Sequence, residues 1–297
     1  MENRERSGIL LALCGFALLS CGDAVIKTMA GAWSPIAVAA LRFCIGAVVL
    51  SALLFWREGA RAFVPANFWL QVGRGVCLTG ATICFFSAIF VMPLAEAMAL
   101  SFVSPIFVAI LSWPLLGEKA PRATWIVSLI ALVGVGLILR PNFAELGWMA
   151  VLPISSALFF ALMLIANRAS AGQGSTLSMQ AFLAISAAPF LTVAAFIGHQ
   201  TGSDFLAVTV PDWSVVAKCA LVAVSASVAH GLAFLGTMRA GASTIAPTTY
   251  VQLIIAGVLG WAFFDDMPDA TSMLGAAIII AGGIVLWRSA KPVQPAA

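Results

Sequence analysis

Ten long apolar runs, separated by short polar connections, dominate the pattern along this chain. A helix rises about 1.5 Å per residue, so about 20 mostly apolar residues are enough to cross a bilayer core of about 30 Å. The pattern therefore predicts an all-α membrane protein with ten transmembrane helices. The predicted spans are residues 8–28, 35–56, 68–90, 93–115, 122–140, 146–167, 176–198, 214–238, 243–264 and 271–288.

The composition favours lipid over water as the solvent. Of the 297 residues, 62% are hydrophobic and 9% are charged, whereas soluble domains carry about 25% charged residues. A chain of this size could not bury so many apolar faces without a bilayer. The formal net charge of +3 is too small to indicate nucleic-acid binding. The six cysteines all lie in apolar runs, without metal or disulfide spacing, and are interpreted as small core residues.

Lys and Arg are divided unequally between the two sides that these spans would define. Basic residues resist translocation, so the richer side is expected to be cytoplasmic. With the N-terminus inside, the opposite side receives only Arg140 in a loop and Lys27 at a helix end. This asymmetry predicts that both termini are cytoplasmic. The cytoplasmic connections would carry Arg4, Arg6, Arg57, Arg61, Lys119, Arg122, Arg168, Arg239, Arg288 and Lys291.

The second half of the chain repeats features of the first half. Trp113 and Trp261 lie 148 positions apart, and a constant offset of this kind indicates duplication. Five spans per half is an odd number, so the second copy would enter the membrane from the opposite side. We expect two inverted five-helix repeats, residues 1–144 and 145–290, and a short cytoplasmic tail, residues 291–297. The same offset pairs Glu118 with Asp266, Gly134 with Gly282 and Arg140 with Arg288.

The charge pattern tests this inversion independently. Lys119 and Arg122 follow the fourth span, on the side expected to be cytoplasmic. Their equivalents in the second half are Met267 and Ala270. The equivalent loop of the second half, which would face outward, thus lacks these positive charges, as an inverted repeat requires.

Two stretches resemble the drug/metabolite transporter superfamily, in which two EamA-type half-domains form a ten-helix carrier. They read AEAMALSFVSPIFVAILSWPLLGE (95–118) and AGASTIAPTTYVQLIIAGVLGWAFFDD (240–266), and each ends in a Trp followed by an acidic turn. In the second half Gln252 and Leu253 stand where the family commonly has a Glu-Pro pair. A kink is therefore not expected there, whereas Pro105 is the expected hinge of the first half.

The resemblance implies a bacterial inner-membrane carrier that works by alternating access. Its cavity would be lined by the first, third, fourth, sixth, eighth and ninth spans. Within the superfamily the chain is most similar to amino acid and metabolite exporters of the YddG type, which implies export of neutral or aromatic amino acids. Uptake, or transport of a nucleoside-like cofactor, vitamin or drug, is the alternative. The expected partners of this monomeric carrier are a small-molecule substrate and lipid, without cofactor, metal or nucleic acid.

Enzyme signatures are absent from the sequence. There is no phosphate-cradling Gly-rich loop with Lys, no paired His at metal spacing and no Gly-x-Ser-x-Gly elbow. A non-enzymatic carrier is therefore expected, and an intramembrane enzyme or assembly scaffold stands as the alternative of a different class. A polar midplane between inverted repeats favours transport.

Charged residues inside spans are costly and therefore need a reason. Asp23 and Lys27 share one face of the first span, and Arg42 and Glu96 lie near the outer ends of theirs. These four residues predict either a polar gate or binding cluster at the external mouth, or a structural ion-pair network with a snorkelling Lys27. Arg74, near the inner end of the third span, is expected to be an interfacial anchor.

Neutral polar residues form a second candidate set near the midplane. His230 is an imidazole in mid-span, where it could donate to a ligand or simply bond a neighbouring carbonyl. Pro105 and Pro153 remove backbone donors and free carbonyls for partners. Serines and threonines in spans are alternatively packing residues, and the glycines Gly134 and Gly136 are assigned to helix packing. The cavity candidates are Ser101, Ser104, Ser155, Ser156, His230, Thr248, Thr249, Tyr250 and Gln252.

Overall fold

A computed structural model describes residues 2–91, 94–139, 147–264 and 270–289. Within these ranges the chain is helical and contains no strand, as the apolar runs predict. The elements, with η marking 3-10 turns, are α1 (Glu2–Lys27), α2 (Pro35–Glu58), η1 (Ala60–Phe63), α3 (Phe68–Val91), α4 (Leu94–Ser101), α5 (Ser104–Leu116), α6 (Arg122–Leu139), η2 (Gly147–Ala150), α8 (Val151–Ala169), α9 (Thr176–Gln200), η3 (Asp204–Leu206), α10 (Trp213–Ala240), α11 (Ala242–Ile245), η4 (Ala246–Tyr250), α12 (Val251–Phe264) and α13 (Ala270–Ser289).

Local sequence signals explain where several of these helices begin and end. Ser175 accepts a bond of 3.0 Å from the Ser178 backbone N–H and caps α9, and Asp212 caps α10 through the Ser214 N–H at 3.1 Å. Gly59, with φ of 77°, ends α2 in a conformation that other residues rarely adopt. These caps lie in the polar connections that separate the apolar runs.

The lengths of the helices fit a bilayer. Within the described ranges, seven helices are long and apolar enough to cross a membrane, and three shorter apolar helices accompany them. The chain is therefore a multi-pass helical membrane protein. Two predicted spans are broken in the structure: residues 93–115 divide into α4 and α5, and residues 243–264 divide into α11, η4 and α12.

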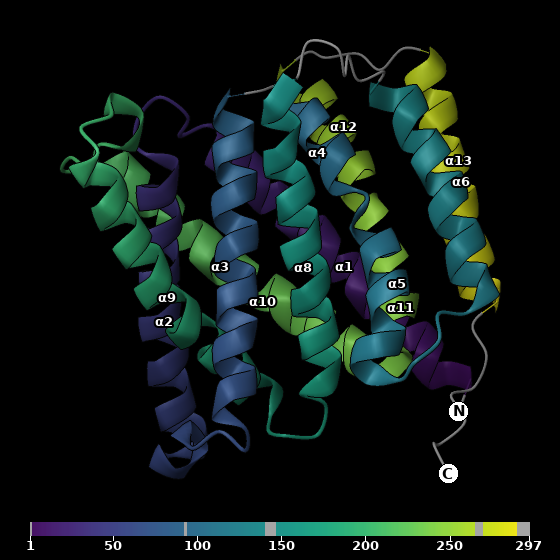
Figure 1. Cartoon of the computed structure of the whole chain (residues 1–297), viewed down its shortest axis with the longest axis horizontal. Helices are drawn as coiled ribbons and strands as arrows, with labels where there is room; N and C mark the ends of the chain where they lie inside the picture. Colours follow the sequence, from purple (N-terminus) through teal and green to yellow (C-terminus); the bar gives the residue numbers. More distant parts are fainter. Residues whose placement is uncertain (1, 92–93, 140–146, 265–269, 290–297) are drawn as a thin grey trace.

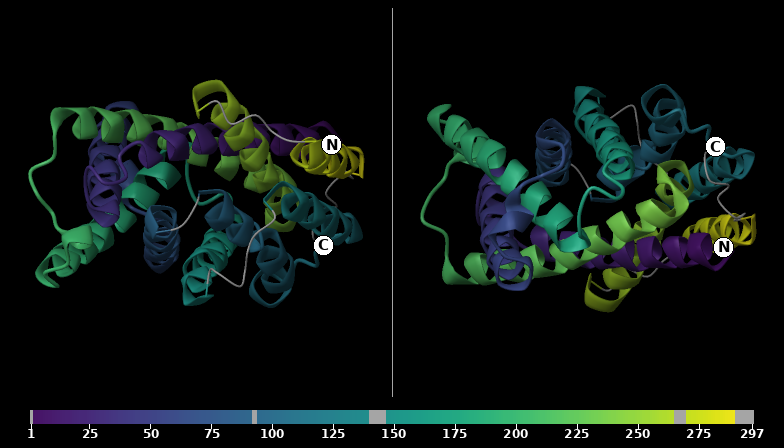
Figure 2. Two further views of the ribbon diagram at one scale, coloured as in Figure 1. Left: turned by 90° about the horizontal axis from the view of Figure 1, so that it is seen from above. Right: turned by 90° about the horizontal axis from the view of Figure 1, so that it is seen from below.

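The long helices pack in pairs that are distant in sequence. Helix α1 lies along α10, α3 along α8, and α2 along α9 (Figure 2). Helices α6 and α13 lie side by side and run in opposite directions (Figure 1). We call the end of the bundle where α1 begins and α13 ends the lower end, as it is drawn in Figure 1.

Glycines bring some of these helices into close contact. A Cβ placed on Gly15 would lie 2.7 Å from the Ala229 carbonyl oxygen, so α1 and α10 approach closely there. A Cβ on Gly134 would lie 2.8 Å from the Gly275 oxygen across the α6–α13 contact, but Gly136 has nothing within 4 Å. The packing role expected for Gly136 is wrong, because residues two apart on a helix point to different faces.

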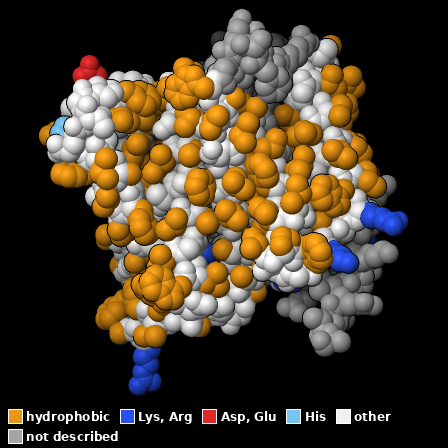
Figure 3. All heavy atoms as spheres, in the orientation of Figure 1, with side chains coloured by type: hydrophobic (Ala, Val, Ile, Leu, Met, Phe, Trp, Pro, Cys, Tyr) orange, Lys and Arg blue, Asp and Glu red, His pale blue; other side chains and the backbone are white. Residues whose placement is uncertain are grey.

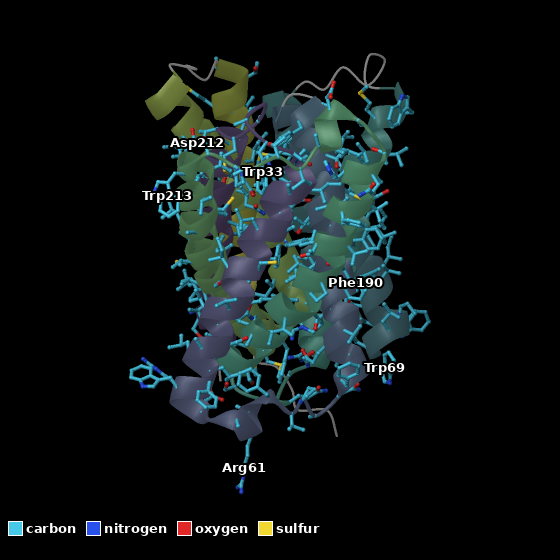
Figure 4. The ribbon with its side chains drawn as sticks, turned by 90° about the vertical axis from the view of Figure 1, so that its left-hand side faces the viewer. Trp33, Arg61, Trp69, Phe190, Asp212 and Trp213 are labelled. Atoms are coloured by element: carbon cyan, nitrogen blue, oxygen red, sulfur yellow. The ribbon has the colours of Figure 1, made fainter. Side chains whose placement is uncertain are left out.

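The outer surface has the polarity expected of a membrane protein. Hydrophobic side chains cover most of the face drawn in Figure 3, and Lys and Arg side chains lie toward its lower end. Exposed tryptophans mark both ends of the bundle: Trp213 (79% exposed) lies near the upper end and Trp69 (78% exposed) near the lower end (Figure 4). This arrangement is typical of an aromatic belt at the two membrane interfaces.

Candidate functional site

A cavity of about 120 Å³ lies at the centre of the bundle. Its wall comes from α1, α2, α3, α4, α5, α8, α10, η4 and α12. Leu78, Phe85, Phe86 and Phe160 contribute apolar and aromatic surface. A mostly apolar pocket with a few convergent polar groups is the usual form of a small-molecule site. The polar members of the lining are Asp23, Arg42, Thr82, Ser101, Ser104, Ser156, His230, Thr249 and Gln252.

The helix break in the first half directs polar groups into this cavity. Helix α4 ends at Ser101 and α5 begins at Ser104. Pro105 has no N–H, so the helical hydrogen bond to the Ser101 carbonyl cannot form. The Ser101 hydroxyl donates to the Ala97 carbonyl at 2.8 Å and lies 3.4 Å from the Pro153 carbonyl of α8.

The predicted span at residues 243–264, in the second half of the chain, is also broken, which the sequence did not predict. The break falls at η4, around Pro247, a few residues before Gln252 and Leu253. Thr249 donates its hydroxyl to the Ala246 carbonyl at 2.8 Å and lines the cavity. A proline inside the span thus produces the irregular backbone without the Glu-Pro pair.

Two opposite charges face the cavity without bonding each other. Arg42 is 7% exposed, and its guanidinium carbon lies 4.5 Å from the Phe43 ring centroid and 5.3 Å from that of Phe86. Asp23 of α1 lines the same cavity and is near enough to Arg42 to interact electrostatically. Among the described residues, neither side chain makes a hydrogen bond or salt bridge. Their charged groups are therefore available to a ligand.

The structure brings part of the expected external cluster together with the midplane candidates. Asp23 and Arg42 line the same cavity as His230. Lys27, in the last turn of α1, is not part of the cavity wall. The side chain of Glu96 lies outside the described residues. The sequence could not show that the external cluster and the midplane candidates share one cavity, because residues on α1, α2 and α10 meet only through tertiary packing.

Most of the midplane candidates share the cavity, but three do not. Ser101, Ser104, Ser156, His230, Thr249 and Gln252 all line it. Ser155, Thr248 and Tyr250 are absent from its wall. The Ser156 hydroxyl donates to the Ala81 carbonyl of α3 at 2.9 Å, and the Thr248 hydroxyl donates to the Ile245 carbonyl at 2.6 Å.

Tyr250 connects the two helix breaks. Its ring centroid lies 5.5 Å from that of Phe102, at the α4–α5 break. Its hydroxyl lies 3.2 Å from the Phe102 carbonyl oxygen and 3.3 Å from the Ser128 carbonyl oxygen of α6. A hydroxyl has one proton, so it donates to one of these acceptors at a time. The side chain is 2% exposed and holds the two breaks together.

We therefore expect Tyr250→Phe to lower stability and leave ligand affinity nearly unchanged. The substitution removes the one hydroxyl proton that the Phe102 and Ser128 carbonyls share, and losing such a buried hydrogen bond typically costs about 1 to 3 kcal/mol. Thermal unfolding of the purified protein in detergent would measure the loss. An unchanged melting temperature combined with weaker ligand binding would contradict this role and place the hydroxyl at the ligand.

Arg74 is a buried cation, although its sequence position suggested the interface. Its Nε donates to the Asn167 side-chain oxygen at 2.9 Å, and its Nη1 bonds Gln71 and the Met179 carbonyl. Its side chain is 0% exposed and lies over the Phe234 ring, 5.2 Å from the centroid. The interfacial role expected of it is wrong, because α3, α8, α9 and α10 enclose this position. Hydropathy cannot show which face of a span is enclosed.

Metal-binding chemistry has no support in the described part of the chain. No group of three His, Cys, Asp or Glu side chains gathers there in a way that could hold a metal ion. The cavity groups are instead a carboxylate, a guanidinium, an imidazole, an amide and hydroxyls. This set is suited to binding a polar organic molecule through hydrogen bonds and charge.

Comparisons with known proteins identify relatives across nearly the whole chain. A family model described as the EamA-like transporter family matches residues 6–140 and 147–288. A pseudopaline exporter of Pseudomonas aeruginosa is 27% identical over 96% of this chain and 98% of its own length. An S-adenosylmethionine uptake transporter of Rickettsia prowazekii is 25% identical over 96% of this chain and 94% of its length. A riboflavin transporter of Brucella anthropi is 26% identical over 82% of this chain and 84% of its own length.

A solved crystal structure shares the fold. It superposes with a TM-score of 0.80 over 96% of this chain and 98% of that chain. The two sequences are 20% identical. This similarity shows the arrangement of the helices and carries no information on the molecule that is transported.

Proposed function

The chain belongs to the EamA-like transporter family, and from this premise we propose that it exports zwitterionic, amino-acid-like metabolites across the bacterial inner membrane by alternating access. Its relatives are transporters of small metabolites rather than enzymes. The pseudopaline exporter matches this chain over nearly the full length of both proteins, and this match supports export as the direction of transport.

The free charges of Asp23 and Arg42 carry the proposal on substrate class. An amino acid presents a carboxylate and an ammonium, and the cavity presents a guanidinium and a carboxylate that are not bonded to each other. Arg42 can bind the substrate carboxylate in a bidentate manner, and Asp23 can accept from the ammonium. Ser101, His230 and Gln252 add neutral donors and acceptors, and the aromatic rings accept an apolar side chain.

We propose that two inverted repeats form this site between them. The family model matches the chain twice, which supports duplication. The packing supports it too. If α8 and α10 are the equivalents of α1 and α3, the α1–α10 contact in one half corresponds to the α8–α3 contact in the other. Helix α2 packs against its expected equivalent α9, and α6 packs against its expected equivalent α13. Helices α6 and α13 run in opposite directions (Figure 1), as an inverted repeat requires.

The proposed orientation places the lower end in the cytoplasm. Arg61 extends from that end, whereas Asp212 lies near the upper end (Figure 4). Basic residues stay on the cytoplasmic side of short loops. A cysteine introduced at Ser203 is expected to react with an impermeant maleimide added to intact cells, and one introduced at Gly172 is expected to react only after lysis. The reverse result would contradict the orientation.

Flux in proteoliposomes tests the proposed function directly. Vesicles would be loaded with radiolabelled L-phenylalanine, phenethylamine or 3-phenylpropionate, which share the ring but differ in the charged groups. We expect protein-dependent release of phenylalanine well above that of the other two, because only the zwitterion satisfies both Asp23 and Arg42. Empty vesicles provide the background. Equal release of all three compounds, or no release above background, would overturn the proposal.

Pro105 is proposed as the hinge of the transport cycle. In Pro105→Ala the new N–H can bond the Ser101 carbonyl and close the break between α4 and α5. We expect transport to slow several-fold while the Kd of the substrate stays the same. Pro114→Ala is the matched control, because Pro114 lies in the same helix and does not line the cavity. Unchanged flux in Pro105→Ala would remove the hinge from the mechanism.

A further inference from the structure

A second, smaller hollow continues from the central cavity toward α9. It has a volume of about 30 Å³ and shares Arg42, Leu78 and His230 with the central cavity. Its far wall includes Gln180, in the second turn of α9. The described residues that line it include a guanidinium, an imidazole, a hydroxyl and an amide, but no carboxylate. Its lining therefore has donors and positive charge without a matching anion.

Gln180 presents an unused donor in this hollow. Its side chain is 5% exposed, and its Nε2 atom is buried without a hydrogen-bond partner. Buried amide groups in native proteins are almost always paired, so an unpaired one needs an explanation. An acceptor from a bound molecule would provide the missing bond.

Arg74 adds uncompensated positive charge close behind Gln180. It bonds the backbone carbonyl of Met179, the residue next to Gln180, and its other acceptors, Gln71 and Asn167, are neutral side chains. Its Nη2 atom is buried without a partner. Among the described residues, no carboxylate forms a hydrogen bond or salt bridge with Arg74. Among the described residues that line the two hollows, Asp23 is the one carboxylate, and no bond joins it to Arg74.

We propose that this hollow is a subsite for a second carboxylate of the substrate, so that the preferred substrate is an amino-acid-like molecule with an additional acidic group. The inference rests on the proposed function. Asp23 and Arg42 bind the amino acid group, Gln180 donates to the second carboxylate through Nε2, and Arg74 supplies part of the compensating charge. A carboxylate accepts from both amide and guanidinium donors, and burial strengthens each of these bonds.

L-Glutamate and L-glutamine are the matched probes, because they differ only in whether the distal group is charged. We expect purified wild-type protein to bind glutamate at least ten-fold more tightly than glutamine, measured by ligand-dependent thermal stabilisation. Equal binding of the two, tighter binding of glutamine, or no binding of either would overturn the proposed subsite.

Gln180→Glu tests the site without any ligand. This substitution places a carboxylate of nearly the same shape where the substrate's second carboxylate is proposed to bind. We expect a higher melting temperature than wild type in the absence of ligand, and loss of the preference for glutamate. A purely structural role for Gln180 predicts the opposite, because an additional buried carboxylate would then lower the melting temperature. Gln180→Leu is the control: it removes the unpaired amide without adding a charge, so it should lose the preference for glutamate and gain less stability than Gln180→Glu.

The two levels of the proposal fail in different ways. Release of phenylalanine from vesicles together with a lower melting temperature of Gln180→Glu would keep the zwitterion carrier and remove the second carboxylate site. A higher melting temperature of Gln180→Glu without release of any amino acid would keep an anion site and remove the proposed amino acid substrate.

Discussion

Arg42→Gln is expected to abolish measurable transport of zwitterionic substrates while the protein still folds. Removing one partner of a buried charged pair typically costs about 2 to 5 kcal/mol, or roughly 30-fold to several thousand-fold in affinity. Arg42 makes no hydrogen bond to the described part of the protein, so the fold does not depend on such a bond. Loss of binding in ligand-dependent thermal stabilisation, together with loss of flux in vesicles, would measure the effect.

Three further variants identify which interaction is lost. Arg42→Lys keeps the charge but not the planar fork, so we expect partial recovery of affinity. Asp23→Asn should weaken binding of phenylalanine but leave 3-phenylpropionate, which lacks the ammonium, nearly unaffected. Arg61→Gln is the matched control, because Arg61 projects from the lower end of the bundle (Figure 4). Normal flux in Arg42→Gln would refute the role of Arg42 in binding.

Gly75→Ala is expected to destabilise the protein far more than Gly73→Ala, although both change one glycine of α3. A Cβ on Gly75 would lie 2.3 Å from the Ser186 Cβ and 2.8 Å from the Ser186 carbonyl carbon. Real Cβ atoms do not approach so closely, so α3 and α9 would have to separate. Overpacking of this kind typically costs about 1 to 3 kcal/mol, and occasionally more when the backbone must shift.

Gly73 provides the internal comparison. A Cβ there would have nothing within 4 Å, and alanine is a better helix former than glycine by up to about 1 kcal/mol. Gly73→Ala should therefore melt at or above the wild-type temperature, whereas Gly75→Ala should melt well below it or be recovered in low folded yield. Thermal unfolding and size-exclusion chromatography in detergent would measure both. Equal melting temperatures of the two variants would contradict the α3–α9 contact.

The positions of the helices could be predicted from the sequence. A backbone in lipid must satisfy its own hydrogen bonds, so a long apolar run folds as a helix irrespective of its neighbours. The run at 35–56 accordingly becomes α2, and the run at 176–198 becomes α9. Pro105 indicated the break between α4 and α5 for a similarly local reason. The resemblance of residues 95–118 and 240–266 to known carriers indicated the family.

The make-up of the cavity was only partly predictable. His230, Gln252 and Ser101 stood out as polar residues in apolar spans, and all three line the cavity. Tyr250 stood out for the same reason, yet its hydroxyl bonds the Phe102 carbonyl or that of Ser128 instead of facing the cavity. The sequence shows that a buried polar group needs a partner, but not whether that partner is the protein or a ligand.

Tertiary packing alone decided which residues meet. It placed Asp23 and Arg42 beside His230, enclosed Arg74, and put Gly75 rather than Gly73 against α9. The physical reason is that lipid tails and protein interiors are both apolar, so hydrophobicity does not distinguish the face of a span that contacts lipid from the face that contacts another helix. A span's sequence therefore determines that it is a helix in the membrane, whereas close packing between helices determines which way each of its side chains points.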